Sequence, residues 1–182
     1  LAGNMLPMAR PNFRQARESD RERLIELEGQ GYPFETSQTE LERAIFHNPL
    51  GNLRDFYVGE VDGDIVAQGF LFRLHAWFGG ARVKMGGIAS VAVAAEARGT
   101  GAGSALIEHL HAVARKRGLP LTMLYAFRQG FYSRLGYGPT TSRRRLSIDP
   151  RSIPRTWNAP VRRGVDRKTI EKHHRQVAST MT

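Results

Sequence analysis

The alternation of apolar and polar residues predicts three long β-strands in the first half of the chain. Residues 56–61 and 65–78 are rich in β-branched and aromatic side chains, and the turn at 62–64 separates them as in a β-hairpin. A Gly-Gly turn at 79–80 then leads into a third strand over residues 82–94. These segments together predict an antiparallel meander.

The other elements are expected to be helices and short strands. Apolar side chains recur on one face of a helix predicted over 101–117, and they are Leu106, Leu110, Val113 and Ala114. Ser19 or Asp20 can cap a helix over 19–29, and Ser37 with Glu40 forms a capping-box pattern for a helix over 36–47. The remaining expected elements are a strand over 13–16, a short buried strand over 121–126, a helix over 129–135 and a closing strand or hairpin arm over 137–148. This order is that of an α+β domain.

The segment 89–107 carries the most chemical information. A β-branched apolar run enters a loop with glycines at positions 99, 101 and 103, and a helical pattern follows at once. Glycines let backbone N–H groups approach a ligand closely, and the first turn of a helix leaves four N–H groups without internal partners. The helix dipole adds favourable charge, so this loop is predicted to bind a phosphate or pyrophosphate.

Two common nucleotide-binding motifs do not fit this loop. A dinucleotide fold has G-x-G-x-x-G and an acidic residue about twenty positions later, whereas Ser104 stands at the third glycine and residues 118–122 contain no acid. A P-loop has a Lys-Ser/Thr pair after its last glycine, and none follows Gly103. The pattern that remains is Arg98-x-x-Gly101-x-Gly103.

Composition narrows the class of protein. The 182 residues suffice for one domain, and 41% apolar with 24% charged residues is typical of a globular protein. Cysteine is absent, which excludes disulfides, thiolate metal sites and a cysteine nucleophile. Residues 1–8 lack the pattern of a signal peptide, and no apolar run approaches the roughly 20 residues of a membrane span. We therefore expect a cytoplasmic protein without a membrane partner.

The formal net charge of +10 has two interpretations. Arginine-rich clusters lie at 115–117, 143–145 and 162–163, but no helix-turn-helix, zinc-finger or RNP pattern accompanies them, so no specific nucleic-acid partner is expected. Either these clusters are solvated surface, or their positive charge attracts a cofactor with several phosphates.

The glycine pattern and the element order β-α-α-β-β-β-α-β-α-β resemble the Gcn5-related N-acetyltransferases (GNAT) over residues 10–148. Two later segments, LTMLYA at 121–126 and GFYSRLGYG at 130–138, are similar to L-L-Y-A and Y-x-R-x-G-Y-G of the Eis-like branch. The resemblance implies a mixed, mostly antiparallel central sheet flanked by helices. It also implies transfer of an acetyl group from acetyl-CoA to a primary amine of a small molecule or of lysine.

The resemblance assigns the cofactor to backbone groups of the fourth strand and the loop. The pantetheine arm would pair with residues 91–93, the pyrophosphate would lie on the N–H groups of residues 99–104, and Arg98 would shape the start of the loop. The Eis-like branch commonly has arginines where this chain has Gly99 and Thr100, which leaves a backbone cradle. The expected cofactor-binding residues are Val91, Ala92, Val93, Arg98, Gly99, Thr100, Gly101, Ala102, Gly103 and Ser104.

Acetyl transfer needs an oxyanion donor, a proton donor and a neutral amine. A backbone N–H near Val93 suits the oxyanion. Tyr132 matches the family's general acid, because a phenol with a pKa of about 10 stays protonated at neutral pH; the alternative is a packed aromatic like Tyr137. No metal is expected, since His109 and His111 lack metal-ligand spacing.

The base is not evident. In the Eis-like branch the C-terminal carboxylate of a longer chain is the general base. Other members of the family have a glutamate on the fourth strand, where this chain has only Ser90. Glu28, Glu35, His75 or a water chain are the alternatives. Without a base, the chain would be a non-catalytic CoA-binding module.

The loop over residues 29–35 is expected to form the substrate pocket. We expect Tyr32, Phe34 and Glu35, with Glu28, to line a cleft whose carboxylates attract a cationic amine. The alternative is a hydrophobic cap on the sheet with the acids in solvent.

Residues 149–182 are predicted to be a basic tail or linker. Residues 161–168 echo residues 13–21, which suggests the start of a truncated second domain, and the alternative is a terminal basic helix over 167–178. The oligomeric state stays open.

Overall fold

The computed structural model describes residues 9–32, 37, 42–43, 45–140, 145–152 and 166–180. The chain forms two compact units. The larger comprises Leu1–Ala76 and Val83–Tyr137, and the smaller comprises Trp77–Arg82 and Gly138–Thr182. The segments of chemical interest all belong to the larger unit.

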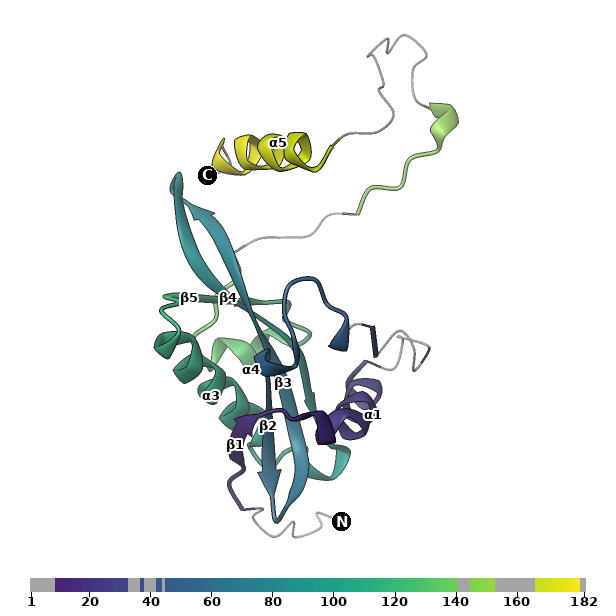
Figure 1. The fold of residues 1–182 in the computed structure, drawn as a ribbon, viewed down its shortest axis with the longest axis vertical. Coiled ribbons are helices and arrows are strands. Elements are labelled where there is room, and N and C mark those ends of the chain that lie inside the picture. The colour runs from purple at the N-terminus through teal and green to yellow at the C-terminus, as the bar shows by residue number, and fades with distance from the viewer. Residues whose placement is uncertain are drawn as a thin grey trace. The chain divides into compact units, whose positions relative to one another are not determined.

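A five-stranded sheet in the order β1-β2-β3-β4-β5 forms the centre of the fold (Figure 1). Its strands are β1 (Asn12–Gln15), β2 (Phe56–Val61), β3 (Asp64–Phe78), β4 (Ala81–Val93) and β5 (Leu121–Leu124). The pairs β1–β2 and β2–β3 are antiparallel, whereas β4 and β5 run parallel. The expected mixed sheet and the meander are therefore confirmed.

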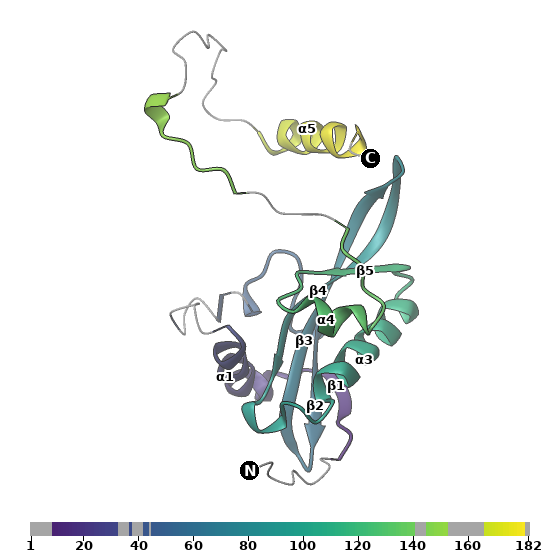
Figure 2. The same cartoon turned by 180° about the vertical axis from the view of Figure 1, so that it is seen from behind.

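Helices α1 (Arg21–Gly31) and α3 (Ala102–Lys116) cover opposite faces of this sheet (Figures 1 and 2). Alternate residues of a strand point to opposite faces, so β3 contributes Phe70 to the core under α1 and Leu71 to the core under α3. Gly69 makes the second core tight, because a β-carbon there would lie 2.9 Å from Leu110 Cδ1. The core between α1 and the sheet also contains Leu24, Leu27, Phe56 and Val58. The core between α3 and the sheet also contains Leu106, Ile107, Leu110 and Ala114.

The α3 helix agrees with its prediction, but the first helix begins differently. A single 3-10 turn (η1, Glu18–Asp20) precedes α1, which continues to Gly31 rather than ending at Gly29. Asp20 does not cap α1 through its side chain. Its carboxylate instead accepts hydrogen bonds from Arg14 Nη1 and from the Arg17 N–H, both at 2.7 Å. Most of the helix expected over 36–47 lies outside the described residues, of which 42–43 and 45–46 are helical.

Three expectations for residues 121–148 were wrong. Strand β5 ends at Leu124 and is not buried, since Leu121 is 40% and Met123 42% exposed. An apolar run alone cannot distinguish a central strand from one that pairs on a single side, as β5 does with β4. Helix α4 (Gln129–Ser133) is shorter than expected, and residues 137–140 and 145–148 form no strand.

The smaller unit contains the tip of the β3–β4 hairpin, a 3-10 turn (η4, Pro150–Ser152) and helix α5 (Arg167–Thr180). Asp166 caps α5, because its carboxylate accepts the Thr169 N–H at 3.0 Å. The helix expected over 167–178 is therefore confirmed. No helix within the described part of the chain is long and apolar enough to cross a membrane.

His109 on α3 should make the fold sensitive to acid. Its ring stacks on Phe13 at 4.9 Å and lies 5.4 Å from Tyr57, and no described residue bonds its buried Nε2. Burial, and secondarily the charge of Lys116, lowers the pKa of His109. As the pH falls, His109 in the unfolded chain therefore takes up a proton before His109 in the folded chain does. The free energy of unfolding should thus decrease as the pH falls below about 6.5, the unperturbed pKa of histidine.

We expect His109→Phe to weaken this acid dependence while preserving the ring stack. The check is the urea-unfolding free energy of both proteins at pH 8 and pH 5, where the difference between the two pH values should be smaller in the variant. An equal difference in both proteins would show that His109 does not contribute.

Candidate functional site

The glycine loop between β4 and α3 has the geometry of an anion cradle. After a 3-10 turn (η3, Ala95–Ala97), Gly99 and Gly101 adopt φ values of 81° and 93°, which favour glycine strongly. Gly101 is the N-cap residue of α3, and no described residue accepts the N–H groups of the helix's first turn, residues 102–104. These N–H groups are available to an anionic ligand at the positive end of the helix dipole.

Two side chains of the loop hold its shape instead of pointing to a ligand. Arg98 Nε donates to the Val93 carbonyl and its Nη2 to the Gln30 carbonyl, both at 3.2 Å. The Thr100 hydroxyl donates to the Ala97 carbonyl at 2.7 Å. Arg98 therefore ties the end of β4 to the end of α1 at the start of the loop.

Strands β4 and β5 separate before the loop begins. Their pairing ends at Ile88 with Leu124, whereas β4 continues to Val93. Ser90 has a φ of 50°, a left-handed conformation that is uncommon outside glycine and that marks the point of separation. The sequence carried no signal for this irregularity beyond the β-branched run around it.

The open edge of β4 presents backbone groups of alternate residues, Val91 and Val93. The Ala94 N–H donates to the Val66 carbonyl on β3 at 2.8 Å. Because successive residues of a strand alternate in direction, the N–H and carbonyl of Val93 point to the other edge, which β5 has left. Arg98 reaches the Val93 carbonyl on that edge, and no described residue accepts the Val93 N–H.

Tyr132 lies on α4 and is 3% exposed. Its ring packs edge-on against Phe127, Phe131 and Tyr137 at 5.7, 4.9 and 5.9 Å. Burial raises the pKa of Tyr132 to about 12, and Tyr32 and Tyr137 add smaller contributions. Because of this raised pKa, the phenol is protonated at neutral pH. No described residue forms a hydrogen bond with its hydroxyl.

Gly103 is the point where the cradle, β4 and α4 meet. A β-carbon at this position would lie 3.4 Å from Val93 Cγ2 and 3.5 Å from Phe131 Cζ. Phe131 precedes Tyr132 on α4, so the first turn of α3 lies against both the open edge of β4 and the helix that carries the buried phenol. The predicted phosphate site and the predicted acid thus belong to one local arrangement.

The end of α1 approaches the same part of β4 from the other face. A β-carbon at Gly31 would lie 3.0 Å from Ala92 Cβ. Tyr32 follows, and it is close enough to Tyr132 to raise the pKa of that phenol. Glu28 is not in solvent, since it is 4% exposed and accepts a hydrogen bond from Gln68 Nε2 at 2.7 Å. Phe34 and Glu35 lie outside the described residues.

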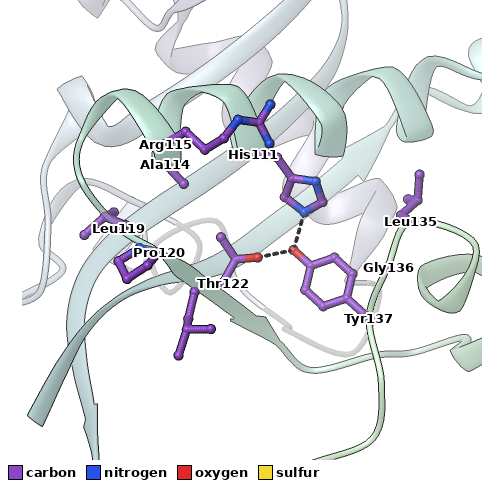
Figure 3. Close-up of a pocket in the computed structure, with 10 residues that line it drawn as sticks. His111, Ala114, Arg115, Leu119, Pro120, Thr122, Leu135, Gly136 and Tyr137 are labelled. Atoms are coloured by element: carbon purple, nitrogen blue, oxygen red, sulfur yellow. Dashed lines mark hydrogen bonds between the residues drawn. The ribbon is translucent and has the colours of Figure 1, made fainter. Parts of the chain in front are cut away.

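A separate cavity of about 260 Å³ lies at the other end of α3 (Figure 3). There the Tyr137 hydroxyl lies 2.8 Å from His111 Nε2 and 2.9 Å from Thr122 Oγ1. The α-helical rise places this end about 16 Å from the cradle. These contacts fix Tyr137, whose ring in turn supports that of Tyr132. No group of three potential metal ligands occurs among the residues that the structure describes.

Comparisons with known proteins agree with this geometry. A GCN5-related N-acetyltransferase from Kribbella flavida is 26% identical with a TM-score of 0.61, over 69% of this chain and 32% of that one. Its counterpart from Anabaena variabilis is 27% identical with a TM-score of 0.61, over 69% and 31%. A Mycobacterium tuberculosis protein in complex with CoA is 28% identical with a TM-score of 0.52, over 69% and 70%.

The chain thus spans about a third of the length of the first two structures. No curated protein matches its sequence significantly. The family model described as an acetyltransferase (GNAT) domain matches residues 12–140. The chain therefore belongs to the GNAT acetyltransferase family.

Proposed function

We propose that this chain transfers an acetyl group from acetyl-CoA to a primary amine of a small molecule or of lysine. The observation that carries the proposal is the contact at Gly103, which joins the anion cradle to the helix of the buried phenol Tyr132. A phosphate site alone would suit many ligands, whereas this junction combines it with an open strand edge and a proton donor.

The cofactor is proposed to lie along β4 and the loop. The N–H groups of residues 99–104 would bind the pyrophosphate, and the open edge at Val91, Ala92 and Val93 would pair with the pantetheine arm. Arg98 and Thr100 hold the loop in shape through backbone carbonyls, so the cradle depends on backbone groups. The related mycobacterial protein solved with CoA supports this assignment.

The chemistry follows from three groups of the chain. Acetyl-CoA supplies a thioester whose carbonyl carbon the amine attacks directly, with cleavage of the carbon–sulfur bond. The Val93 N–H stabilises the negative charge that develops on the carbonyl oxygen. Tyr132 donates its proton to the departing sulfur, for which a phenol held protonated by burial is suited.

Features of the sequence refine the proposal. Tyr32, Phe34, Glu35 and Glu28 are proposed to line the amine pocket, within an acetyltransferase domain over 10–148 followed by a basic linker or the start of a second domain over 149–182. The motifs at 121–126 and 130–138 support the Eis-like branch. Ser90, where other members have a glutamate, favours the alternative of a CoA-binding module without turnover.

A two-stage experiment separates these functions. Calorimetric titration with acetyl-CoA should show 1:1 binding, and a panel of primary amines should then release free thiol in proportion to acetylated product. Binding without thiol release from any amine would favour the non-catalytic module. Absence of acetyl-CoA binding would contradict both.

A further inference from the structure

The cavity at the C-terminal end of α3 takes no part in the proposed acetyl transfer. Its volume is about 260 Å³, and three segments line it: the last turns of α3, the start of β5 with the turn before it, and the residues after α4 (Figure 3). Pockets for drug-sized molecules measure about 300–1,000 Å³, so this cavity suits a smaller ligand. It lies about 16 Å along α3 from the cradle, so the two sites can be occupied together.

One part of the cavity lining is apolar. Leu119 is buried there, whereas Leu121 at the start of β5 remains 40% exposed. Pro120 and Leu135 complete this apolar wall. Residues 118–127 carry no charged side chain, although the chain has a formal net charge of +10. The wall can therefore bury the apolar body of a small ligand, which removes apolar surface of both from water.

The rest of the lining brings polar groups of two kinds. The Tyr137 hydroxyl lies 2.8 Å from His111 Nε2 and 2.9 Å from Thr122 Oγ1, so these three side chains hold one another in place. Arg115 is different, because it is exposed and no described residue forms a hydrogen bond or an ion pair with its guanidinium. The cavity therefore combines a fixed polar group with a cation that has no described partner.

Positive charge is in excess at this end of α3. Burial lowers the pKa of His111, the charge of Arg115 lowers it further, and Glu108 has a smaller opposite effect. Glu108 already pairs with Arg10 at 3.5 Å. The carbonyls at a helix C-terminus oppose an anion, but here those of residues 113–115 accept N–H groups of residues 117–119. An anion near Arg115 and His111 would thus reduce an unfavourable charge interaction.

We propose that this cavity binds a small carboxylate with an apolar body. The carboxylate accepts hydrogen bonds from Arg115, whose planar guanidinium matches its geometry, and it lies near His111. The apolar body lies against Leu121 and Leu135. An inorganic anion would leave the apolar wall unused, and a neutral apolar molecule would leave Arg115 without a partner. The binding is non-covalent and does not depend on the proposed acetyl transfer.

The test titrates the protein with phenylacetate at low ionic strength and follows the backbone amide resonances by NMR. Phenylacetamide, which is nearly isosteric and uncharged, and acetate, which lacks the ring, are the matched ligands. We expect saturable shifts with 1:1 stoichiometry at residues 119–122 and 135–137, and weaker binding of both matched ligands. Saturating acetyl-CoA should leave the affinity for phenylacetate unchanged, because the cradle is a separate site.

Two substitutions on α3 distinguish a specific contact from general attraction by a basic protein. Arg115→Gln should weaken phenylacetate binding about three- to fivefold, which is the contribution of a partly exposed ion pair. Lys116→Gln removes the neighbouring exposed charge, which does not line the cavity, and should leave the affinity unchanged. The side chain of Arg115 is exposed, so thermal melting should show that both variants keep the fold.

The two histidines of α3 provide a second readout. Bound phenylacetate should raise the pKa of His111, measured from its ring resonances, because a nearby negative charge favours the imidazolium. Phenylacetamide should not raise it. The pKa of His109 should stay the same with either ligand, because its ring packs on Phe13 and Tyr57 and does not line the cavity.

The outcomes that overturn the inference are distinct from one another. Equal weakening by Arg115→Gln and Lys116→Gln would mean attraction by the overall positive charge. Equal affinity for phenylacetate and phenylacetamide would mean an apolar patch without an anion site. Displacement of phenylacetate by acetyl-CoA would assign it to the cradle. If Arg115→Gln does not fold, Leu121→Asp takes its place, and its negative charge should repel phenylacetate more than phenylacetamide; equal effects on both would contradict the proposal.

Discussion

Gly103→Asp should abolish acetyl-CoA binding. The new side chain would project from the first turn of α3 into the space between Val93 and Phe131. Its carboxylate would occupy the positive end of the helix dipole, where the pyrophosphate is proposed to bind. Isothermal titration should therefore show no heat of binding at concentrations that saturate wild type. Gly101→Asp should also abolish binding, with an added cost because residue 101 has a φ of 93°.

Gly103→Ala is the matched control for this variant. Its β-carbon would make ordinary contacts at 3.4 and 3.5 Å, so the protein should fold and keep most of its affinity. Circular dichroism and thermal melting should show that both variants at position 103 retain the fold. Unchanged affinity in folded Gly103→Asp would contradict the assignment of the loop to the cofactor.

Tyr132→Phe should reduce turnover about 10²–10⁴-fold, which is the usual contribution of a general acid. The ring contacts with Phe127, Phe131 and Tyr137 would persist, and no described residue depends on the hydroxyl for a hydrogen bond. Thermal stability and acetyl-CoA affinity should therefore stay close to wild type. The measurement is kcat from thiol release at saturating acetyl-CoA.

Tyr137→Phe separates a catalytic hydroxyl from a structural one on the same short segment. The Tyr137 hydroxyl contacts His111 and Thr122, so its loss should lower stability while changing turnover far less. Wild-type turnover in Tyr132→Phe would make Tyr132 a packed aromatic. Equal losses of turnover in both variants would point to support of α4 rather than proton donation.

The sequence predicts those parts of the fold that local chemistry determines. The meander and α3 follow from side-chain periodicity and glycine turns, and the loop before α3 follows from three glycines ahead of a helical pattern. The left-handed conformation of Ser90, where β4 and β5 part, was not predictable, because residues other than glycine rarely adopt it and no local pattern marks it. The exposed face of β5 was missed since an apolar run does not reveal how many neighbours a strand has.

The candidate site, like the fold, could be predicted from the sequence only in part. The sequence proposed Tyr132 and the loop as candidates through motifs, but it did not associate Glu28 with Gln68, which is 40 positions away. That pairing depends on the placement of α1 across the sheet, which involves the contact of Gly31 with Ala92. Local patterns carry no information on such a distant approach, and the alternative of Glu28 in solvent was wrong for that reason.

The edge of β4 that β5 leaves open, beside Val91 and Val93, bears on how the protein avoids aggregation. Free backbone groups along a strand can recruit strands from other chains and begin aggregation. A pantetheine arm paired there would cover the edge, and a ligand at 100 times its dissociation constant stabilises the native state by about 2.7 kcal/mol. Under the proposed function, the fraction of the protein that is protected from edge-to-edge aggregation would rise with the concentration of acetyl-CoA.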